Sequence, residues 1–303
     1  MADPNLHVKA MAFTKNAYRD IYPAVQPTRP ELSQAGKVVV ITGATRGLGR
    51  GFAVAYAHAK AGAIALIGRS AEALAETEKR VKEISPATMV ISIAVDILDE
   101  DGVNAAFEKI VAQCGIPNVL INNAGCLVLE TIAESTTDSF WKVQEVNVKG
   151  TLIVTKAFLN SIEPCSEEQR AILNLTSVST QYAAVTMDSY TISKVAVTKF
   201  TEFLAAEYPS ITSISLDPGM VATDMGVSVG LIAPFLFDTV DLVGGVAVWL
   251  CSGDKRFLSG RYVSVNWDVD ELERRKEEIV AKDLLSSGLR RGEVAVDELV
   301  IHP

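Results

Sequence analysis

Histidine and cysteine are scarce in this chain of 303 residues. Two of its three histidines, His7 and His302, lie close to the chain ends, so a histidine-based triad or a multi-histidine metal centre is difficult to build. The four cysteines show no CxxC spacing, which favours neither a disulfide framework nor a zinc site and fits a reducing compartment. We therefore expect no metal, and a chemistry that uses other side chains.

A basic surface and a membrane-spanning segment are also missing. Lys and Arg number 28 against 37 Asp and Glu, and the net charge of −9 argues against a protein that tracks nucleic-acid phosphates. The uncharged run 225–237 has 13 residues, which is too short for a membrane-spanning helix. The N-terminus lacks the basic, apolar and small-residue segments of a secretory signal. We expect a soluble, cytoplasmic protein that binds neither nucleic acid nor membrane.

Apolar residues are abundant and regularly ordered. Hydrophobic residues make up 49% of the chain and charged residues 21%, which is enough for a buried core. Apolar, often β-branched runs alternate with helical patterns, as in a parallel sheet covered on both faces. The expected strands are 37–42, 63–68, 88–95, 118–122, 171–177, 210–216 and 261–266. The expected helices are 50–61, 71–84, 99–113, 138–163 and 188–207.

This order predicts one α/β domain over residues 37–267. The domain is expected to be of the doubly wound Rossmann type, with a seven-stranded, mainly parallel sheet and helices on both faces. Residues 1–36 contain four prolines and are expected to form an irregular N-terminal arm. The charge-rich segment 268–285 is expected to be an exposed helix, which begins a C-terminal tail at 268–303. Both ends are expected to be appendages to the domain.

A glycine-rich turn, TGATRGLG at 42–49, follows the first expected strand. Glycines let the backbone turn tightly and approach a pyrophosphate, whose charge the amides at a helix N-terminus then meet. The alternative is a tight connection that binds no ligand. As a binding turn it supplies these candidate cofactor-binding residues: Gly43, Thr45, Arg46, Gly47, Leu48 and Gly49.

Further motifs follow the glycine turn in order. They are NNAG at 122–125, NVKG at 147–150, YTISK at 190–194 and Asp-Pro-Gly at 217–219, with Ser177 standing 13 positions before Tyr190. With TGATRGLG, they resemble the motifs of the short-chain dehydrogenase/reductase family over roughly residues 37–266. The sequence departs from the family pattern at Asp217, where Asn is commoner.

The resemblance implies a set of catalytic residues. It makes Tyr190 the general acid in carbonyl reduction, or the base in alcohol oxidation, and makes Ser177 a hydrogen-bond donor to the substrate oxygen. Lys194 would hold the nicotinamide ribose, and Asn147 would hold a water that links Lys194 to solvent. The spacing of four positions places Tyr190 and Lys194 on one helix face, where an ammonium lowers the pKa of a phenol.

The end of the second expected strand indicates which cofactor binds. It reads Gly68-Arg69-Ser70, without the acidic residue that usually holds the ribose in an NAD site. Arg69 could instead contact a 2′-phosphate, and Arg46 adds a second cation of the kind seen in NADP-preferring relatives. The alternative is that both arginines are solvated surface charges. We expect NADP(H).

Further contacts are implied by the resemblance alone. For the cofactor they are Ser70, Asp96, Ile97, Asn123, Ala124, Gly125, Pro218, Gly219, Val221 and Thr223. The family places a substrate-covering loop at about 220–240, and the apolar run 226–238 here is equally compatible with a buried helix or an oligomer contact. As a loop it implies an apolar pocket, with no evident cation, formed by Tyr182, Met187, Met225, Ile232, Phe235 and Phe237.

The expected function is that of an NADP(H)-dependent carbonyl reductase or alcohol dehydrogenase, transferring a hydride between nicotinamide and a ketone or secondary alcohol. Segments 22–37 and 259–272 resemble a fungal branch of the family that is often tied to secondary metabolism, which suggests a ketone, quinone or polyketide-like substrate. The family resemblance implies a homodimer or homotetramer. The alternatives are a cofactor-retaining isomerase, epimerase or dehydratase, and a non-catalytic NADPH-sensing regulatory protein.

Overall fold

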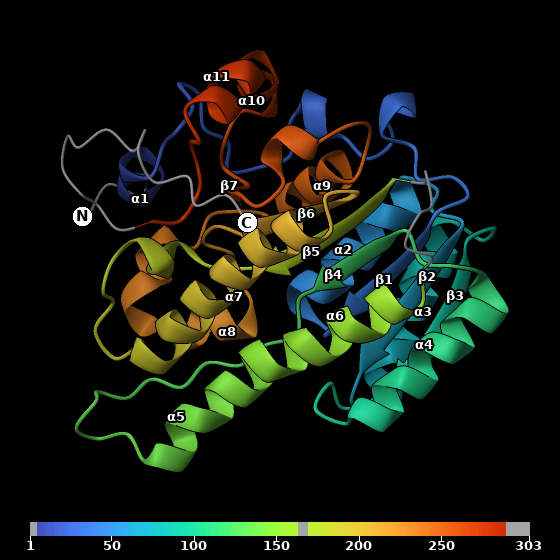
Figure 1. The fold of residues 1–303 in the computed structure, drawn as a ribbon, viewed down its shortest axis with the longest axis horizontal. Helices are drawn as coiled ribbons and strands as arrows, with labels where there is room; N and C mark the ends of the chain where they lie inside the picture. Colours follow the sequence, from blue (N-terminus) through green and yellow to red (C-terminus); the bar gives the residue numbers. More distant parts are fainter. Residues whose placement is uncertain (1–4, 163–168, 289–303) are drawn as a thin grey trace.

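The β-branched runs form one parallel sheet in the computed structural model, which describes residues 5–162 and 169–288 (Figure 1). The strands of the described residues are β1 (Val38–Thr42), β2 (Ala63–Gly68), β3 (Met89–Ala94), β4 (Val119–Asn122), β5 (Arg170–Leu175), β6 (Ile211–Asp217) and β7 (Tyr262–Ser264). Their order is β3-β2-β1-β4-β5-β6-β7, and each neighbouring pair is parallel. The predicted Rossmann-type fold class is confirmed.

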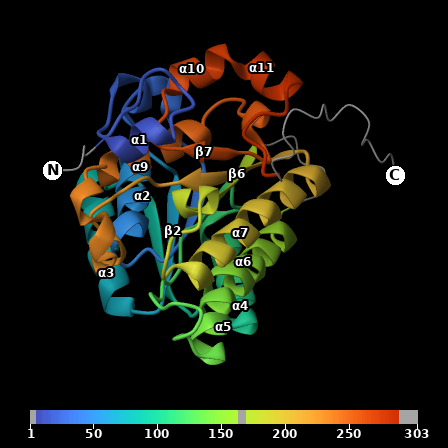
Figure 2. The same ribbon diagram turned by 90° about the vertical axis from the view of Figure 1, so that its left-hand side faces the viewer.

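Helices cover both faces of the sheet (Figure 2). On one face lie α2 (Gly47–His58), α3 (Ala71–Ile84) and α9 (Val240–Leu250), and on the other lie α4 (Glu100–Cys114), α6 (Gly150–Asn160) and α7 (Asp188–Glu207). Two apolar clusters fill the spaces between these layers, one on each face. Strands β1, β2, β4 and β5 are buried at every residue, which is why they read as continuous apolar runs.

The expected helix 138–163 is divided. Helix α5 (Thr137–Gln144) continues through a π-helical turn, η3 (Glu145–Lys149), into α6, so the three form one long rod (Figure 1). A capping box between Thr136 and Ser139 begins it. The remaining short elements of the described residues are α1 (Leu6–Ala10), η1 (Pro23–Val25), η2 (Pro30–Leu32), η4 (Val178–Gln181), α8 (Asp224–Ser228), η5 (Gly230–Phe235), η6 (Arg256–Leu258), α10 (Val269–Arg274) and α11 (Lys276–Ala281).

The described parts of the N-terminal arm and of the C-terminal segment belong to the core, which corrects the expectation that they are appendages. Val25 and Leu32 of the arm are buried in the same cluster as α9. The segment expected to be one exposed helix at 268–285 forms α10 and α11 instead, with Leu272 and Ile279 fully buried. Most of the charged residues lie on the outer side of these helices, Glu271 being buried, and the apolar residues between them pack inwards. The last expected tail residues, 289–303, lie outside the described residues.

The arm and the C-terminal helices also bind each other. Trp267 Nε1 donates a hydrogen bond to the Met11 carbonyl (3.0 Å), and Tyr22 Oη accepts one from the Val269 amide (3.0 Å). The Arg275 guanidinium lies 3.9 Å from the centre of a phenylalanine ring in the arm. Within residues 5–162 and 169–288, no helix combines the length and apolar character needed to cross a bilayer, and no three His, Cys, Asp or Glu side chains gather as metal ligands would.

Packing of the arm on α9 can be tested at Gly245, where a Cβ atom would come 2.4 Å from the Val25 carbonyl oxygen. We expect Gly245→Ala to lower the free energy of unfolding by at least about 1 kcal/mol, because the clash exceeds the gain in helix propensity. Urea denaturation measures the effect. The control is Gly230→Ala, since a Cβ at Gly230 meets no atom within 4 Å. Equal stability of the two variants would contradict the packing.

Candidate active site

A cavity of about 770 Å³ lies at the carboxyl ends of the strands. The residues that follow β1, β4, β5 and β6 line it, namely Gly43, Asn123, Thr176 and Pro218. In an open parallel sheet, ligands bind in the crevice beyond these ends, at the point where the strand order reverses. That reversal falls between β1 and β4. The cavity is therefore where the topology alone predicts a ligand.

The glycine-rich turn after β1 packs backbone against backbone. A Cβ atom on Gly49 would lie 2.1 Å from the carbonyl oxygen of Gly43, and one on Gly43 would lie 2.9 Å from Cα of Ala124. Gly43 and Gly47 have φ of +65° and +54°, a region that other residues rarely adopt. Only glycine at these positions allows the turn to approach the NNAG segment so closely.

Two side chains hold this turn against the end of β4. Thr42 Oγ1 accepts hydrogen bonds from the amides of Asn123 (3.0 Å) and Ala124 (3.1 Å), and Asn123 Nδ2 donates to the Thr42 carbonyl (2.8 Å). Helix α2 begins at Gly47, so its first amides, which have no partner inside the helix, lie at the cavity wall. The turn and the helix N-terminus together fit the pyrophosphate of a dinucleotide.

Most candidate cofactor residues line the cavity: Gly43, Thr45, Arg46, Gly47, Leu48, Arg69, Asp96, Ile97, Asn123, Ala124, Gly125, Pro218, Gly219, Val221 and Thr223. Gly49 and Ser70 are not part of its lining. Gly49 faces a backbone carbonyl inside the turn, and the Ser70 hydroxyl accepts a hydrogen bond from the Ala73 amide at the start of α3 (3.2 Å). Gly49 and Ser70 therefore act on the backbone of the glycine turn and of the start of α3, which position the residues of the cavity wall.

The arginines that the sequence assigns to a phosphate are both in the cavity wall. Arg46 makes an ion pair with Asp224 (3.0 Å), and the two side chains are 75% and 73% exposed. An exposed ion pair contributes little to stability, so an anion can displace Asp224 from Arg46 at small cost. Sequence analysis did not anticipate this partner, because α8 meets the glycine turn only in the folded chain.

Helix α7 and the segment after β5 bring three of the four expected catalytic side chains, Ser177, Tyr190 and Lys194, together at the cavity. Tyr190 and Lys194, one turn apart on α7, are 9% and 6% exposed. The hydroxyl groups of Ser177 and Tyr190 are hydrogen-bonded to each other. Lys194 Nζ donates to the Leu175 carbonyl (2.7 Å) and lies 5.6 Å from the centre of the Tyr190 ring. A phenol, a hydroxyl and an ammonium thus lie together in one buried corner of the cavity. We call Tyr190, Ser177 and Lys194 the catalytic corner.

Burial shifts the pKa values of both ionisable groups. It raises the pKa of Tyr190 to about 12, opposed by the Ser177 hydrogen bond, and lowers the pKa of Lys194 to about 8. The expected lowering of the Tyr190 pKa is not seen in this structure, in which the net shift is upward. The ammonium binds the Leu175 carbonyl beside the ring, and the loss of solvent around the phenol dominates. Tyr190 therefore keeps its proton at neutral pH.

Asn147 supports the site from behind its wall. It lies in the π-helical turn η3, is 1% exposed and does not line the cavity. Its Oδ1 accepts a hydrogen bond from the Cys126 amide (2.8 Å), and its Nδ2 donates to the Cys126 carbonyl (3.0 Å) and to Ser193 Oγ (2.9 Å). Asn147 thereby fixes the segment that follows NNAG. Its part in a proton relay stays a prediction.

Asp217, the departure from the family motif, is a buried hydrogen-bond acceptor. Its Oδ1 accepts from the amides of Val178 (3.0 Å) and Gly219 (3.4 Å), and the hydroxyl groups of Tyr262 and Ser264 also bind the carboxylate. Burial raises the pKa of Asp217. The carboxylate ties the segment after β5 to the turn after β6, the two segments that flank the catalytic corner.

Segment 220–238 forms a loop that contains α8 and the 3₁₀ helix η5. The loop lines the cavity mainly through apolar side chains. Four of the expected substrate-pocket residues line it: Tyr182, Met187, Met225 and Ile232. Of the readings left open, a single buried helix is excluded, because the segment is irregular and α8 buries none of its residues.

Phe235 and Phe237, the other two expected pocket residues, do not line the cavity. Phe237 is 57% exposed, and its ring lies 5.4 Å from the Arg19 guanidinium. Leu236 lines the cavity in their place. A tight turn at Leu236, closed by a hydrogen bond from the Phe237 amide to the Phe235 carbonyl (2.9 Å), sends neighbouring side chains in different directions. An apolar run in the sequence does not show which of them points inwards.

Two ionisable side chains of the cavity were not indicated by the sequence. Lys142 of α5 and Cys126, the residue after NNAG, both line the cavity. The expectation that the pocket has no cation therefore needs correction. Burial raises the pKa of the Cys126 thiol, against the opposing charge of Lys142. No motif marks Lys142, whose place in the wall depends on how α5 packs against α7.

Comparison with known proteins agrees with this geometry. The family model for short chain dehydrogenases matches residues 37–231. Short chain dehydrogenase mpl6 of Monascus purpureus is 33% identical over 88% of this chain and 93% of its own length, and andI of Emericella variicolor is 31% identical over 92% and 96%. The chain belongs to the short-chain dehydrogenase/reductase family of oxidoreductases, which use nicotinamide cofactors, and falls in a fungal branch of it.

Solved structures share the fold at lower identity. The short chain dehydrogenase from Shigella flexneri has a TM-score of 0.72 with 23% identity, over 78% of this chain and 93% of that one. L-sorbose reductase from Gluconobacter frateurii, solved with NADPH and L-sorbose, has a TM-score of 0.70 with 24% identity, over 78% and 97%. At these identities the likeness establishes the architecture.

Proposed function

We propose that this protein is an NADP(H)-dependent carbonyl reductase or alcohol dehydrogenase that acts on a mainly apolar ketone or secondary alcohol. The observation that carries the proposal is the buried corner of Tyr190, Ser177 and Lys194 in a cavity that also contains a glycine cradle. A dinucleotide-binding protein without catalysis has no physical need for a buried phenol that is hydrogen-bonded to a serine and faces the cavity.

The reaction divides between cofactor and protein. A nicotinamide cofactor supplies or accepts the hydride when bound. The residues that would hold it are the turn Gly43–Leu48 at the pyrophosphate, Asn123 at the ribose and Lys194 at the second ribose. The protein donates or accepts the proton and positions the substrate, and the residues of the catalytic corner perform both tasks.

Tyr190 is suited to donate a proton to a carbonyl oxygen. Its pKa of about 12 keeps it protonated, and the Ser177 hydroxyl, already bonded to the phenol, can donate to the same substrate oxygen. The phenolate that forms is stabilised by the ammonium of Lys194, whose pKa of about 8 leaves it largely charged at neutral pH. In the direction of alcohol oxidation the same phenolate takes the proton.

Arg69 supports NADP(H) over NAD(H). It lies in the cavity wall directly after β2, at the position where an acidic residue would repel a 2′-phosphate. Guanidinium groups bind phosphate with paired, charge-assisted hydrogen bonds. Arg46 is the second candidate, once it leaves Asp224.

An oligomer is supported by a band of exposed apolar side chains on α5, α6 and α7. These are Trp141, Leu152, Ile192, Val195 and Phe203, each between 44% and 59% exposed. Exposed apolar side chains gathered on adjacent helices are typical of a protein–protein interface. We propose a homodimer or homotetramer through these helices, which the mass from light scattering tests. A substrate from fungal secondary metabolism is proposed from the relatives.

Tyr190→Phe tests the acid–base role. We expect kcat for ketone reduction to fall by about 10²- to 10⁴-fold, because the proton donor is lost, while the Kd for NADPH stays nearly unchanged. Reduction of phenanthrenequinone followed by NADPH absorbance, with NADPH fluorescence titration, measures both. Retained turnover would refute the role. Tight NADPH binding without turnover by the unmodified protein would favour the isomerase or sensor alternative.

Arg69→Asp tests cofactor choice. The variant is expected to weaken NADPH binding by about 1.5–3 kcal/mol, roughly 10- to 150-fold, and to leave NADH binding almost unchanged, because only NADPH carries the phosphate. The matched control is Arg80→Asp, on the exposed side of α3. Equal losses for both nucleotides would remove the phosphate contact from the proposal.

A pH profile tests the role of Lys194. Below its pKa of about 8 the side chain is charged and stabilises the phenolate, and above it the charge is lost. We expect kcat for ketone reduction to be level near pH 7 and to fall as the pH rises past about 8, while Tyr190 remains protonated. A rate that stays level up to about pH 10 would contradict this assignment.

A further inference from the structure

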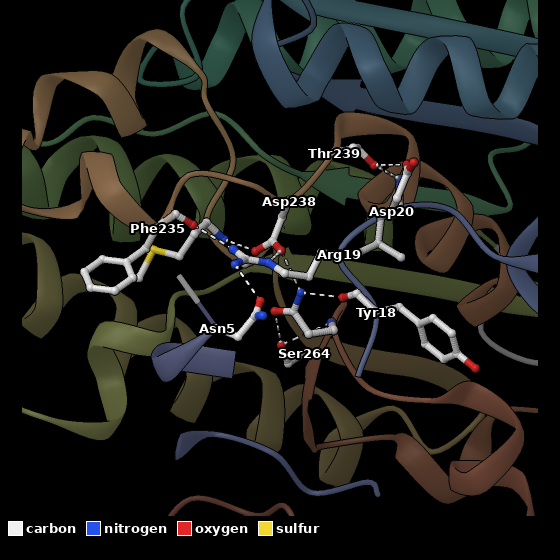
Figure 3. A network of polar contacts seen from close by, with 12 residues as sticks. Asn5, Tyr18, Arg19, Asp20, Phe235, Asp238, Thr239 and Ser264 are labelled. Carbon is white, nitrogen blue, oxygen red and sulfur yellow. Dashed lines mark hydrogen bonds and ion pairs between the residues drawn. The ribbon is translucent and has the colours of Figure 1, made fainter. Parts of the chain in front are cut away.

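Arg19 of the N-terminal arm reaches the loop that covers the cavity (Figure 3). Its Nε donates a hydrogen bond to Asp238 Oδ1 (2.7 Å), and its Nη2 donates to the Phe235 carbonyl (2.6 Å). The side chains of Arg19 and Asp238 are 17% and 0% exposed. One guanidinium therefore binds two points at the end of the loop, and it comes from a segment more than 200 positions earlier in the chain.

Asp238 closes the base of this loop. Its backbone amide donates to the Met220 carbonyl (3.0 Å), and its Oδ2 accepts a hydrogen bond from the Met220 amide. Its Oδ1 accepts from Asn266 Nδ2 (3.0 Å) as well as from Arg19. The first and last residues of segment 220–238 are thus held together by a single buried carboxylate, and Arg19 supplies its positive partner.

The backbone around Arg19 is itself firmly held. The amide of Tyr18 donates to the Asn266 carbonyl (2.8 Å), and Asn266 Nδ2 donates to the Tyr18 carbonyl (2.8 Å). The Thr239 amide donates to the Arg19 carbonyl (3.0 Å), and the Thr239 hydroxyl donates to Asp20 Oδ1 (2.7 Å) (Figure 3). Because residues 18–20 are anchored on both sides, the Arg19 side chain starts from a defined position.

The part of the loop that Arg19 holds is also part of the cavity wall. Ile232 and Leu236 line the cavity on either side of the carbonyl that Arg19 binds. Between its two ends the loop is held by the buried Val229 and by the exposed ion pair of Arg46 with Asp224, while α8 buries none of its residues and η5 contains a proline. A largely buried contact in which one guanidinium binds both a carboxylate and a backbone carbonyl is strong and directional, unlike an exposed ion pair.

We infer that Arg19 is a positioning residue for the substrate wall, so that the N-terminal arm sets the size of ketone that the cavity accepts. The inference rests on the proposed reductase function. It implies that bulky ketones, which contact the wall at Ile232 and Leu236, depend on Arg19. Small ketones, which reach only the catalytic corner, are expected to bind independently of Arg19.

The test compares Arg19→Gln with Arg29→Gln, a control in the same arm whose ion pair with Glu31 is exposed. We expect Arg19→Gln to raise the KM for phenanthrenequinone by about tenfold and to change the KM for diacetyl, kcat and the Kd for NADPH by less than about threefold. Arg19→Lys, which keeps one contact to Asp238, should lie between. Equal KM changes for both ketones, or none, would overturn the inference.

A second readout does not require activity. Hydrogen exchange of the amides in segment 221–237 should be about tenfold faster in Arg19→Gln than in the unmodified protein, and unchanged in Arg29→Gln. If Arg19→Gln does not fold, Arg19→Lys takes its place in this measurement. Unchanged exchange in a folded Arg19 variant would overturn the inference. If the unmodified protein reduces neither ketone, the proposed function fails, while the exchange data still decide whether the arm holds the loop.

Discussion

Backbone contact between the end of β1 and the end of β4 is the constraint on which the site depends. Gly43 lies against Ala124, and Thr42 and Asn123 join the two segments with reciprocal hydrogen bonds. A single added carbon atom at Gly43 would force them apart. Because the sheet extends outwards in both directions from this point, the same contact opens the crevice, starts α2 at its rim and turns the NNAG segment towards α7.

Loss of solvent then determines the chemistry of the catalytic corner. Tyr190, Lys194 and Asp217 are each less than one-tenth exposed, and burial is the main cause of all three pKa shifts. Burial stabilises the uncharged form of each group relative to the charged form. The phenol therefore holds its proton more firmly, while the lysine releases its proton more easily. Hydrogen bonds to Ser177 and Leu175 oppose the cost of burying these polar groups.

The cavity is completed by parts of the chain that the family match does not cover. That match ends at residue 231, whereas Leu236 lines the cavity and Asp238 closes the loop. The described part of the arm and the helices α10 and α11 pack beside β7 and α9 (Figure 2). The architecture shared with the family therefore supplies the cofactor cradle and the catalytic corner, while Arg19 of the arm holds the loop that forms the outer wall, where relatives with different substrates have reason to differ.

The sequence by itself determined the order of strands and helices and the glycine turn, because apolar periodicity and glycine spacing act on neighbouring residues. The Ser177, Tyr190 and Lys194 set came from the resemblance of its motifs to those of the family. The sequence could not show that α2 begins as early as Gly47, or that Phe235 and Phe237 point away from the cavity. Tertiary structure alone decided the partners of Arg19 and Arg46, the place of Lys142 and the pKa values. Those depend on contacts between distant segments and on burial, and neither leaves a local pattern in the chain.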